Sequence, residues 1–213
     1  ANTLRLALSG QLGADAMASD AMRESFALCV SCKGCKRECP TGVDMAKMKI
    51  EYLHQHQQQH GLSTKDKLIA YLPRYAPYAA KFSRLLNLRD AIPRLAQWSE
   101  EKLGFSARRP LPKWRPDYFR VNQSRSDPAN GGRDVALFVD TFTTYFEPEN
   151  ARSALRVLRA AHYNIHLPRA ASSSRPLCCG RTFLSVGLVD EAKKEAQRLV
   201  TAMLPYMEQD IPI

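Results

Sequence analysis

Four cysteines fall within eleven residues, and they constrain the fold of this chain more than any other feature. Gaps of two, two and three residues separate Cys29, Cys32, Cys35 and Cys39, and a proline follows the last of them. This spacing is typical of thiolates that hold an iron–sulfur cluster. Three ligands spaced by two residues can converge on one cluster from a tight loop, while the fourth leaves in a new chain direction. The run therefore predicts a 4Fe–4S site.

Two other interpretations of the cysteine run are weaker. Disulfides would have to close very short loops, which their geometry disfavours. A structural zinc site is the stronger alternative because zinc also binds thiolates, but its ligand pairs are usually separated by a longer spacer. The ligand spacing favours the cluster.

A second cysteine site follows an expected short strand and precedes a helical region. It consists of Cys178 and Cys179, with Gly180 after them. Glycine lets the backbone come close to a bound group, and adjacent cysteines rarely bridge each other. The pair could ligate a metal or cluster, act as redox-active thiols, or pack as small buried side chains. Its position in a turn favours a functional use.

The first 103 residues predict an all-helical unit. Ser19 or Asp20 can cap a helix that leads into the cysteine run. After that run, Thr41 is expected to cap a helix that ends near His60, with Gly61 as terminator. Two or three further helices are expected from Ser63 to Leu103, with Ser63 or Thr64 as the cap of the first. Residues 104–133 are rich in proline, glycine and basic residues, which indicates a linker or a segment that lies on the surface.

Residues 134–213 predict a small α/β domain. Val135–Val139 and Tyr163–Leu167 read as buried parallel strands. Pro148 is placed to begin a helix through Ala161, and a last helix is expected over Val189–Met207. The apolar residues 211–213 look like the start of another strand, so this domain is expected to be truncated at its C-terminal end. Together with the helical unit, this order predicts an α+β chain.

Charge and cysteine usage limit the partners. The chain has 31 Lys and Arg against 21 Asp and Glu, a formal net charge of +10, and much of the excess lies between residues 81 and 120. Such a stretch could meet an anionic membrane surface, an acidic protein or nucleic acid, or be a solvated face. No zinc-finger spacing or aromatic–basic platform supports nucleic acid. Cysteines confined to two clusters favour a reducing, cytoplasmic compartment, with peripheral contact at the cytoplasmic membrane face as a hypothesis.

The segment from Cys29 to Asp44, CVSCKGCKRECPTGVD, resembles the second cluster motif in the iron–sulfur part of FAD-linked 2-hydroxyacid dehydrogenases. This group includes the D-2-hydroxyglutarate, D-lactate and glycolate-oxidising types. Val135–Pro148 and Cys178–Lys194 resemble the cysteine-rich CCG domain of the same family. Asp140 and Thr141 stand near the position where many CCG domains carry a further cysteine.

The resemblance implies a ferredoxin-like helical domain followed by a CCG domain. Upstream, an FAD-binding dehydrogenase domain would oxidise the 2-hydroxyacid, and clusters would pass electrons singly to a quinone or a carrier protein. This chain would be the electron-transfer part, with no catalytic residue and no activity alone. Cys29, Cys32 and Cys35 would hold one 4Fe–4S cluster. Cys39 would reach another cluster, whose remaining ligands are expected to precede Ala1.

Neighbouring residues of the cysteine run are expected to tune such a cluster. Lys33, Lys36 and Arg37 would offset its negative charge, and Gly34 is expected to adopt a positive φ. Two further functions stay open: a zinc-stabilised basic binding domain, and a thiol–disulfide module that uses Cys178 or Cys179.

Overall fold

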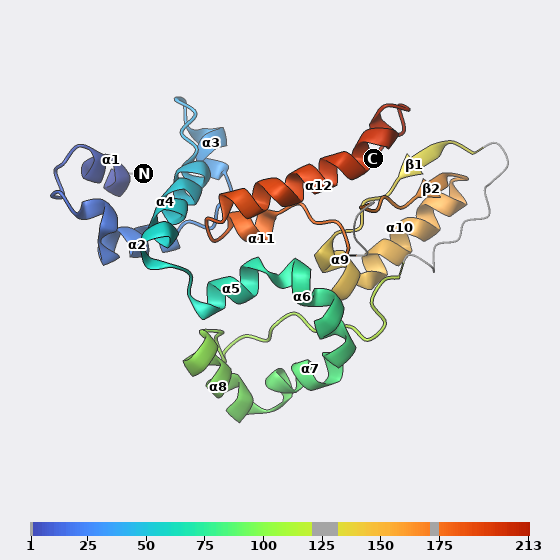
Figure 1. The fold of residues 1–213 in the computed structure, drawn as a ribbon, viewed down its shortest axis with the longest axis horizontal. Coiled ribbons are helices and arrows are strands. Elements are labelled where there is room, and N and C mark those ends of the chain that lie inside the picture. The colour runs from blue at the N-terminus through green and yellow to red at the C-terminus, as the bar shows by residue number, and fades with distance from the viewer. Residues whose placement is uncertain (1, 121–131, 171–174) are drawn as a thin grey trace. The chain divides into compact units, whose positions relative to one another are not determined.

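The computed structural model describes residues 2–120, 132–170 and 175–213, and within them the chain is mostly helical with one small parallel sheet (Figure 1). This content agrees with the predicted α+β class. Two compact units are present, residues 1–62 with 184–189, and residues 63–183 with 190–213. Part of the predicted linker, residues 121–131, lies outside the described residues.

The first unit contains α1 (Asn2–Leu8), α2 (Asp20–Ala27), α3 (Gly34–Glu38) and α4 (Met45–His60), with a short 3-10 turn at Ala16–Ala18. Its core is formed by Leu4, Met22, Phe26 and Tyr52, which are all buried. The rings of Phe26 and Tyr52 stack with their centroids 4.5 Å apart. This core therefore packs α2, which precedes the cysteine run, against α4, which follows it, and against α1.

Capping residues set the ends of these helices. The predicted cap of α2 is confirmed at Ser19, whose hydroxyl accepts a hydrogen bond from the Met22 amide. The predicted cap at Thr41 is wrong, because Asp44 caps α4 by accepting from the Lys47 amide at 3.1 Å. Thr41 belongs to a turn in which the Gly42 amide donates to the Cys39 carbonyl at 3.0 Å, so the helix starts later. Gly61 ends α4 as predicted, with a φ of 72°.

The second unit begins with α5 (Thr64–Ala70), α6 (Leu72–Ala79), α7 (Ser83–Ala91) and α8 (Pro93–Leu103), with a 3-10 turn at Ala80–Phe82. Ser63 caps α5, as predicted. The compact units do not divide at residue 103, because α5 and α6 pack within the second unit. The Thr182 hydroxyl donates to the Ala70 carbonyl at 3.0 Å, and the rings of Tyr71 and Phe183 meet edge to face.

The rest of this unit contains β1 (Asp134–Ala136), α9 (Thr141–Tyr145), α10 (Pro148–Ala160), β2 (Asn164–His166), α11 (Arg181–Leu184) and α12 (Val189–Met207). The predicted strands exist but are shorter, and they pair in parallel with Val135 opposite Ile165. The predicted starts of α10 and α12 are confirmed. The Ala136 amide donates to the Pro212 carbonyl at 2.8 Å, so the C-terminal apolar triplet lies beside β1 without forming a strand.

Helix α10 and one buried ring cover the sheet. Ala151 and Leu155 of α10 pack with Ile165 of β2 and with Phe119, which is 4% exposed. The segment before residue 120 therefore packs against the domain. Trp114 and Tyr118 pack against a second cluster around Tyr145.

Candidate functional site

Three of the four clustered cysteines share a cavity in the first unit. Cys29, Cys32 and Cys35 line a hollow of about 390 Å³ between α1, α2, α3 and α4. The end of α2 positions Cys29, whose amide donates to the Phe26 carbonyl at 3.1 Å, and α3 carries Cys35. All six cysteines are free thiols, so the disulfide alternative is not adopted. The structure thus brings together the three residues with the tightest spacing.

Apolar side chains form most of the remaining wall of this cavity. They come from α1, α2 and the start of α4, and include Leu4, Met22, Phe26, Met45 and Ala46. An apolar wall lowers the local dielectric, which tunes the potential of a redox centre held there. Leu28 and Val30 flank Cys29 and are 85% and 79% exposed.

Cys39 is not among the residues that line this cavity. Its Sγ lies 3.1 Å from the Thr41 hydroxyl oxygen. That hydroxyl, followed by the backbone N–H groups of Val43 and Thr41, lowers the pKa of Cys39. The fourth thiol is therefore held by its own turn, which favours the thiolate.

The backbone of the cysteine run differs from the prediction at one position. The positive φ expected at Gly34 is wrong, because Gly34 begins α3. The positive φ angles belong to Ser31 and Lys33, at 56° and 61°. A Cβ on Gly34 would meet only the Cys32 sulfur, at 3.6 Å, which is an ordinary contact. The turn is completed before the helix starts, so the strained residues precede the glycine.

A buried carboxylate faces the lysines of the run. The Nζ atoms of Lys33 and Lys36 each lie 4.0 Å from Oδ2 of Asp44, whose side chain is 9% exposed. The Lys47 amide, then Lys33 and Lys36, lower the pKa of Asp44. Part of the positive charge predicted to offset a cluster is therefore already balanced by a carboxylate.

Sequence reasoning missed Lys49. Its Nζ donates to the Cys29 carbonyl at 2.5 Å, across twenty residues of sequence. This contact ties the first cysteine of the run to α4. Lys49 follows Met45, a cavity-lining residue, by four residues on α4, so the two side chains share one helix face. That spacing could have indicated that Lys49 lies near the cysteine run.

In the part of the chain that the structure describes, no three His, Cys, Asp or Glu side chains gather closely enough to hold one metal ion. Thiolates of an iron–sulfur cluster bind separate irons, and three cysteines around one apolar hollow fit that requirement.

The second cysteine site has one buried and one exposed thiol. Cys178 is 3% exposed, whereas Cys179 is open to solvent. A hydrogen bond between the two side chains raises the pKa of Cys178 and lowers the pKa of Cys179 to about 6, and the Arg181 amide also lowers the latter. The exposed thiol of the pair is therefore the more acidic one, as reactive cysteines are.

Asp140 and Thr141 lie beside this pair. The Thr141 hydroxyl lowers the pKa of Cys178, and the Asp140 carboxylate raises that of Cys179. Thr141 is 1% exposed, and its hydroxyl has no other hydrogen-bond partner among the described residues. The structure thus brings both residues to the cysteine pair.

Gly180 is required by α12 rather than by a bound group. Its φ is +80°, and a Cβ placed there would lie 2.8 Å from the Ala192 carbonyl oxygen. It would also lie 3.3 Å from Cβ of Glu195. The close approach that the sequence suggested exists, but the approaching group is the backbone of α12.

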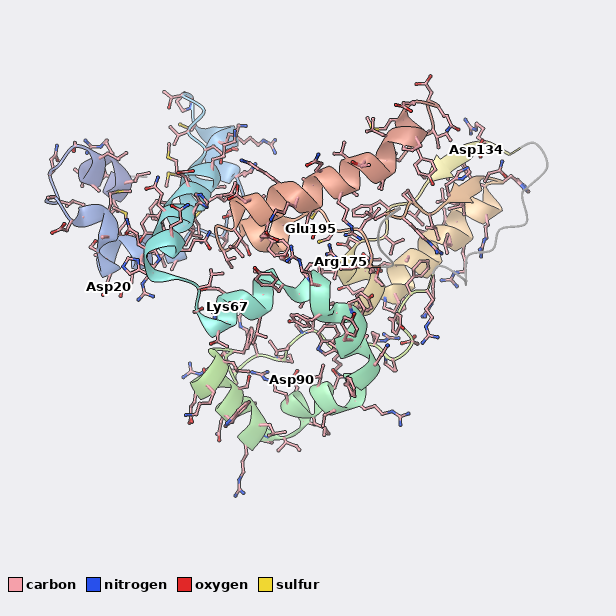
Figure 2. The ribbon with its side chains drawn as sticks, viewed as in Figure 1. Asp20, Lys67, Asp90, Asp134, Arg175 and Glu195 are labelled. Atoms are coloured by element: carbon pink, nitrogen blue, oxygen red, sulfur yellow. The ribbon has the colours of Figure 1, made fainter. Side chains whose placement is uncertain are left out.

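An ion-pair cluster that the sequence did not suggest holds the chain before the cysteine pair. Glu195 of α12, with a side chain 3% exposed, pairs with Arg175 at 2.7 Å and Arg198 at 3.2 Å (Figure 2). Arg74 lies 3.8 Å from the same carboxylate. Arg198 also donates to the carbonyls of Arg175 and Pro176. A buried carboxylate needs such partners, and here they fix the segment that leads into Cys178.

No helix in the described ranges has both the length and the apolar character needed to cross a membrane.

The fold and its two thiol sites define a cysteine-rich α+β module. No family model and no solved structure matches the chain. It is 22% identical over 150 residues to D-2-hydroxyglutarate dehydrogenase of Escherichia coli, which covers 66% of this chain and 15% of that protein. With the Pseudomonas putida protein of the same name, the identity is 24% over 164 residues, covering 72% of this chain and 16% of the relative.

One component of the anaerobic glycerol-3-phosphate dehydrogenase of Escherichia coli is also similar. It is 24% identical over 136 residues, which cover 63% of this chain and 33% of that component. The chain therefore spans about a sixth of the first two relatives and a third of this one. Similarity to parts of two kinds of dehydrogenase points to a redox-related module.

Proposed function

We propose that this chain is the electron-transfer iron–sulfur module of an FAD-linked 2-hydroxyacid dehydrogenase. The observation that carries the proposal is the mostly apolar cavity that Cys29, Cys32 and Cys35 all line. Similarity to D-2-hydroxyglutarate dehydrogenases supports the parent class. The proposed division is a ferredoxin-like helical domain over 1–103, a linker over 104–133 and a CCG domain over 134–213.

Each residue of the first site has a role in this proposal. Cys29, Cys32 and Cys35 would hold a 4Fe–4S cluster as thiolates, and Cys39 would serve as the thiolate of a neighbouring cluster. The cluster supplies one-electron transfer when bound. Lys49 fixes the Cys29 carbonyl, and apolar side chains form most of the remaining wall.

The rest of the reaction belongs to other parts of the parent protein. FAD and the 2-hydroxyacid would bind to its dehydrogenase domain, and a quinone or a carrier protein would accept the electrons. This chain has no role in breaking the substrate bonds and is not expected to be an enzyme alone. The same proposal implies a cytoplasmic location, with peripheral contact at the membrane and no nucleic-acid partner.

A thiol-redox function of the second site is the other candidate. It is favoured by the exposed Cys179, whose pKa the neighbouring thiol lowers to about 6. Cys178 could then act as the buried partner, or both could ligate a metal.

Anaerobic purification followed by iron, sulfide and zinc analysis tests the proposal. We expect iron with equimolar sulfide and a broad visible absorption that dithionite bleaches. Cys32→Ser should remove most of the iron, whereas Cys179→Ser is the matched control and should retain it. Stoichiometric zinc without iron would refute the proposal. Iron that depends on Cys179 and not on Cys32 would move the function to the second site.

A further inference from the structure

A cavity larger than the one at the cysteine run lies in the second unit, and no cysteine lines it. It measures about 530 Å³. Its walls come from helices α5 to α8, from the segment 105–114 that follows α8, and from Phe142 of α9 and Phe146 at the end of that helix. Leucine, isoleucine and aromatic side chains make up most of the wall. Both tryptophans of the chain, Trp98 and Trp114, are among them.

Side chains of α7 hold the extended segment that forms one wall. The Asn87 side chain exchanges two hydrogen bonds with the backbone of Trp114, both at 2.9 Å. Asp90 accepts from the Leu111 amide at 2.8 Å. Arg89 donates to the carbonyl of Phe105 at 3.0 Å and to that of the next residue. The cavity is therefore a built feature of the fold and not a gap beside a loose loop.

The polar side chains in the lining are used within the protein. Tyr75 donates to the Leu68 carbonyl at 2.9 Å, and Thr182 donates to the Ala70 carbonyl at 3.0 Å. Besides its bonds to the extended segment, Arg89 donates to the Ser99 hydroxyl at 3.4 Å. The surface offered to a ligand is therefore almost entirely hydrocarbon and aromatic.

We propose that this cavity binds the hydrocarbon chain of an amphiphile, either a linear acyl chain or a branched isoprenoid chain. Its volume falls in the range of small-molecule sites. Several lining side chains are exposed, with Leu85 at 64% and Trp98 at 54%. Apolar side chains exposed around a hollow mark a binding surface, and a hydrocarbon chain would remove them from water. The inference requires no bound cluster.

Quenching of tryptophan fluorescence measures the binding directly, because both tryptophans line the cavity. The probes are ω-brominated linear alcohols of six to twelve carbons and a brominated farnesol, all used below their micelle concentrations. Binding should be saturable and should tighten about fourfold per added methylene until the cavity is full. Preference for the linear or the branched series identifies the chain type.

Two variants with equal exposure provide the control. Leu86 and Leu88 both lie on α7 and are both 41% exposed, but only Leu86 lines the cavity. Leu86→Glu should abolish saturable quenching, and Leu88→Glu should retain it within twofold. Leu95→Glu, at a lining position of α8 that is also 41% exposed, repeats the test if the first variant does not fold.

The proposal is overturned if no probe quenches saturably, or if the two leucine variants of α7 bind alike. Absence of a dependence on chain length would also overturn it. These readouts involve neither iron nor sulfide, so their failure leaves the proposed electron-transfer function untouched.

Discussion

Replacing Gly180 by alanine should destabilise the second unit through two separate effects. A residue with a side chain at a φ of +80° costs about 1–2 kcal/mol. The added Cβ would also lie 2.8 Å from the Ala192 carbonyl oxygen, which belongs to the backbone of α12 and cannot rotate away. Overpacking of this kind costs about 1–3 kcal/mol. The expected loss in free energy of unfolding is therefore about 2–5 kcal/mol.

Gly104→Ala separates the two effects within the same unit. Gly104 has nearly the same φ, +77°, but its added Cβ would meet only the flexible side chain of Lys65, at 3.3 Å. We expect this control to lose only the conformational part, about 1–2 kcal/mol. Urea titration followed by circular dichroism gives both values. Equal losses in the two variants would refute the argument that α12 requires a glycine after the cysteine pair.

The remaining predictions concern the thiols and the charges of the cysteine run. The rate of Cys179 alkylation by iodoacetamide should rise with pH around a midpoint near 6, because the lowered pKa makes the reactive thiolate the main form above that pH. Cys178→Ala should move this midpoint upward, because it removes the hydrogen bond that lowers the pKa of Cys179. Lys49→Met should speed the loss of iron to a chelator about fivefold, the effect of about 1 kcal/mol from one lost hydrogen bond, whereas unchanged loss would exclude its role. In redox titrations, Asp44→Asn should raise the potential and Lys36→Glu should lower it, and shifts of the opposite sign would contradict the charge argument.

Local signals predicted the helix ends well. Ser19 and Ser63 cap helices, Gly61 ends one and Pro148 begins one, each for reasons confined to a few neighbouring residues. The cap at Thr41 failed because two residues offered similar chemistry, and only Asp44 has its carboxylate against the Lys47 amide. Which of two neighbouring residues caps a helix depends on where the preceding turn ends, and the position of that end could not be predicted from the sequence.

The sequence identified the cysteines of the candidate sites but not the side chains that surround them. The spacing of Cys29, Cys32 and Cys35 predicted that they hold one cluster, which stays a prediction, and the three residues line one cavity. Lys49 joins that site through a single contact across twenty residues, and Asp44 through charges 4.0 Å away. Contacts of this range follow from how the helices pack, so periodicity and motif spacing could not supply them.

The environment of the cysteine pair depends on one helix that carries no cysteine. Sequence spacing can indicate the pairing of Glu195 with Arg198, because they are three residues apart on α12. It cannot indicate that Arg175 and Arg74 reach the same carboxylate from two other segments. A carboxylate with a side chain 3% exposed is stable only with such partners, so losing one of them leaves an uncompensated charge. Helix α12 thus holds the turn of the cysteine pair through charge pairing with the segment before it and through backbone contact with Gly180 after it.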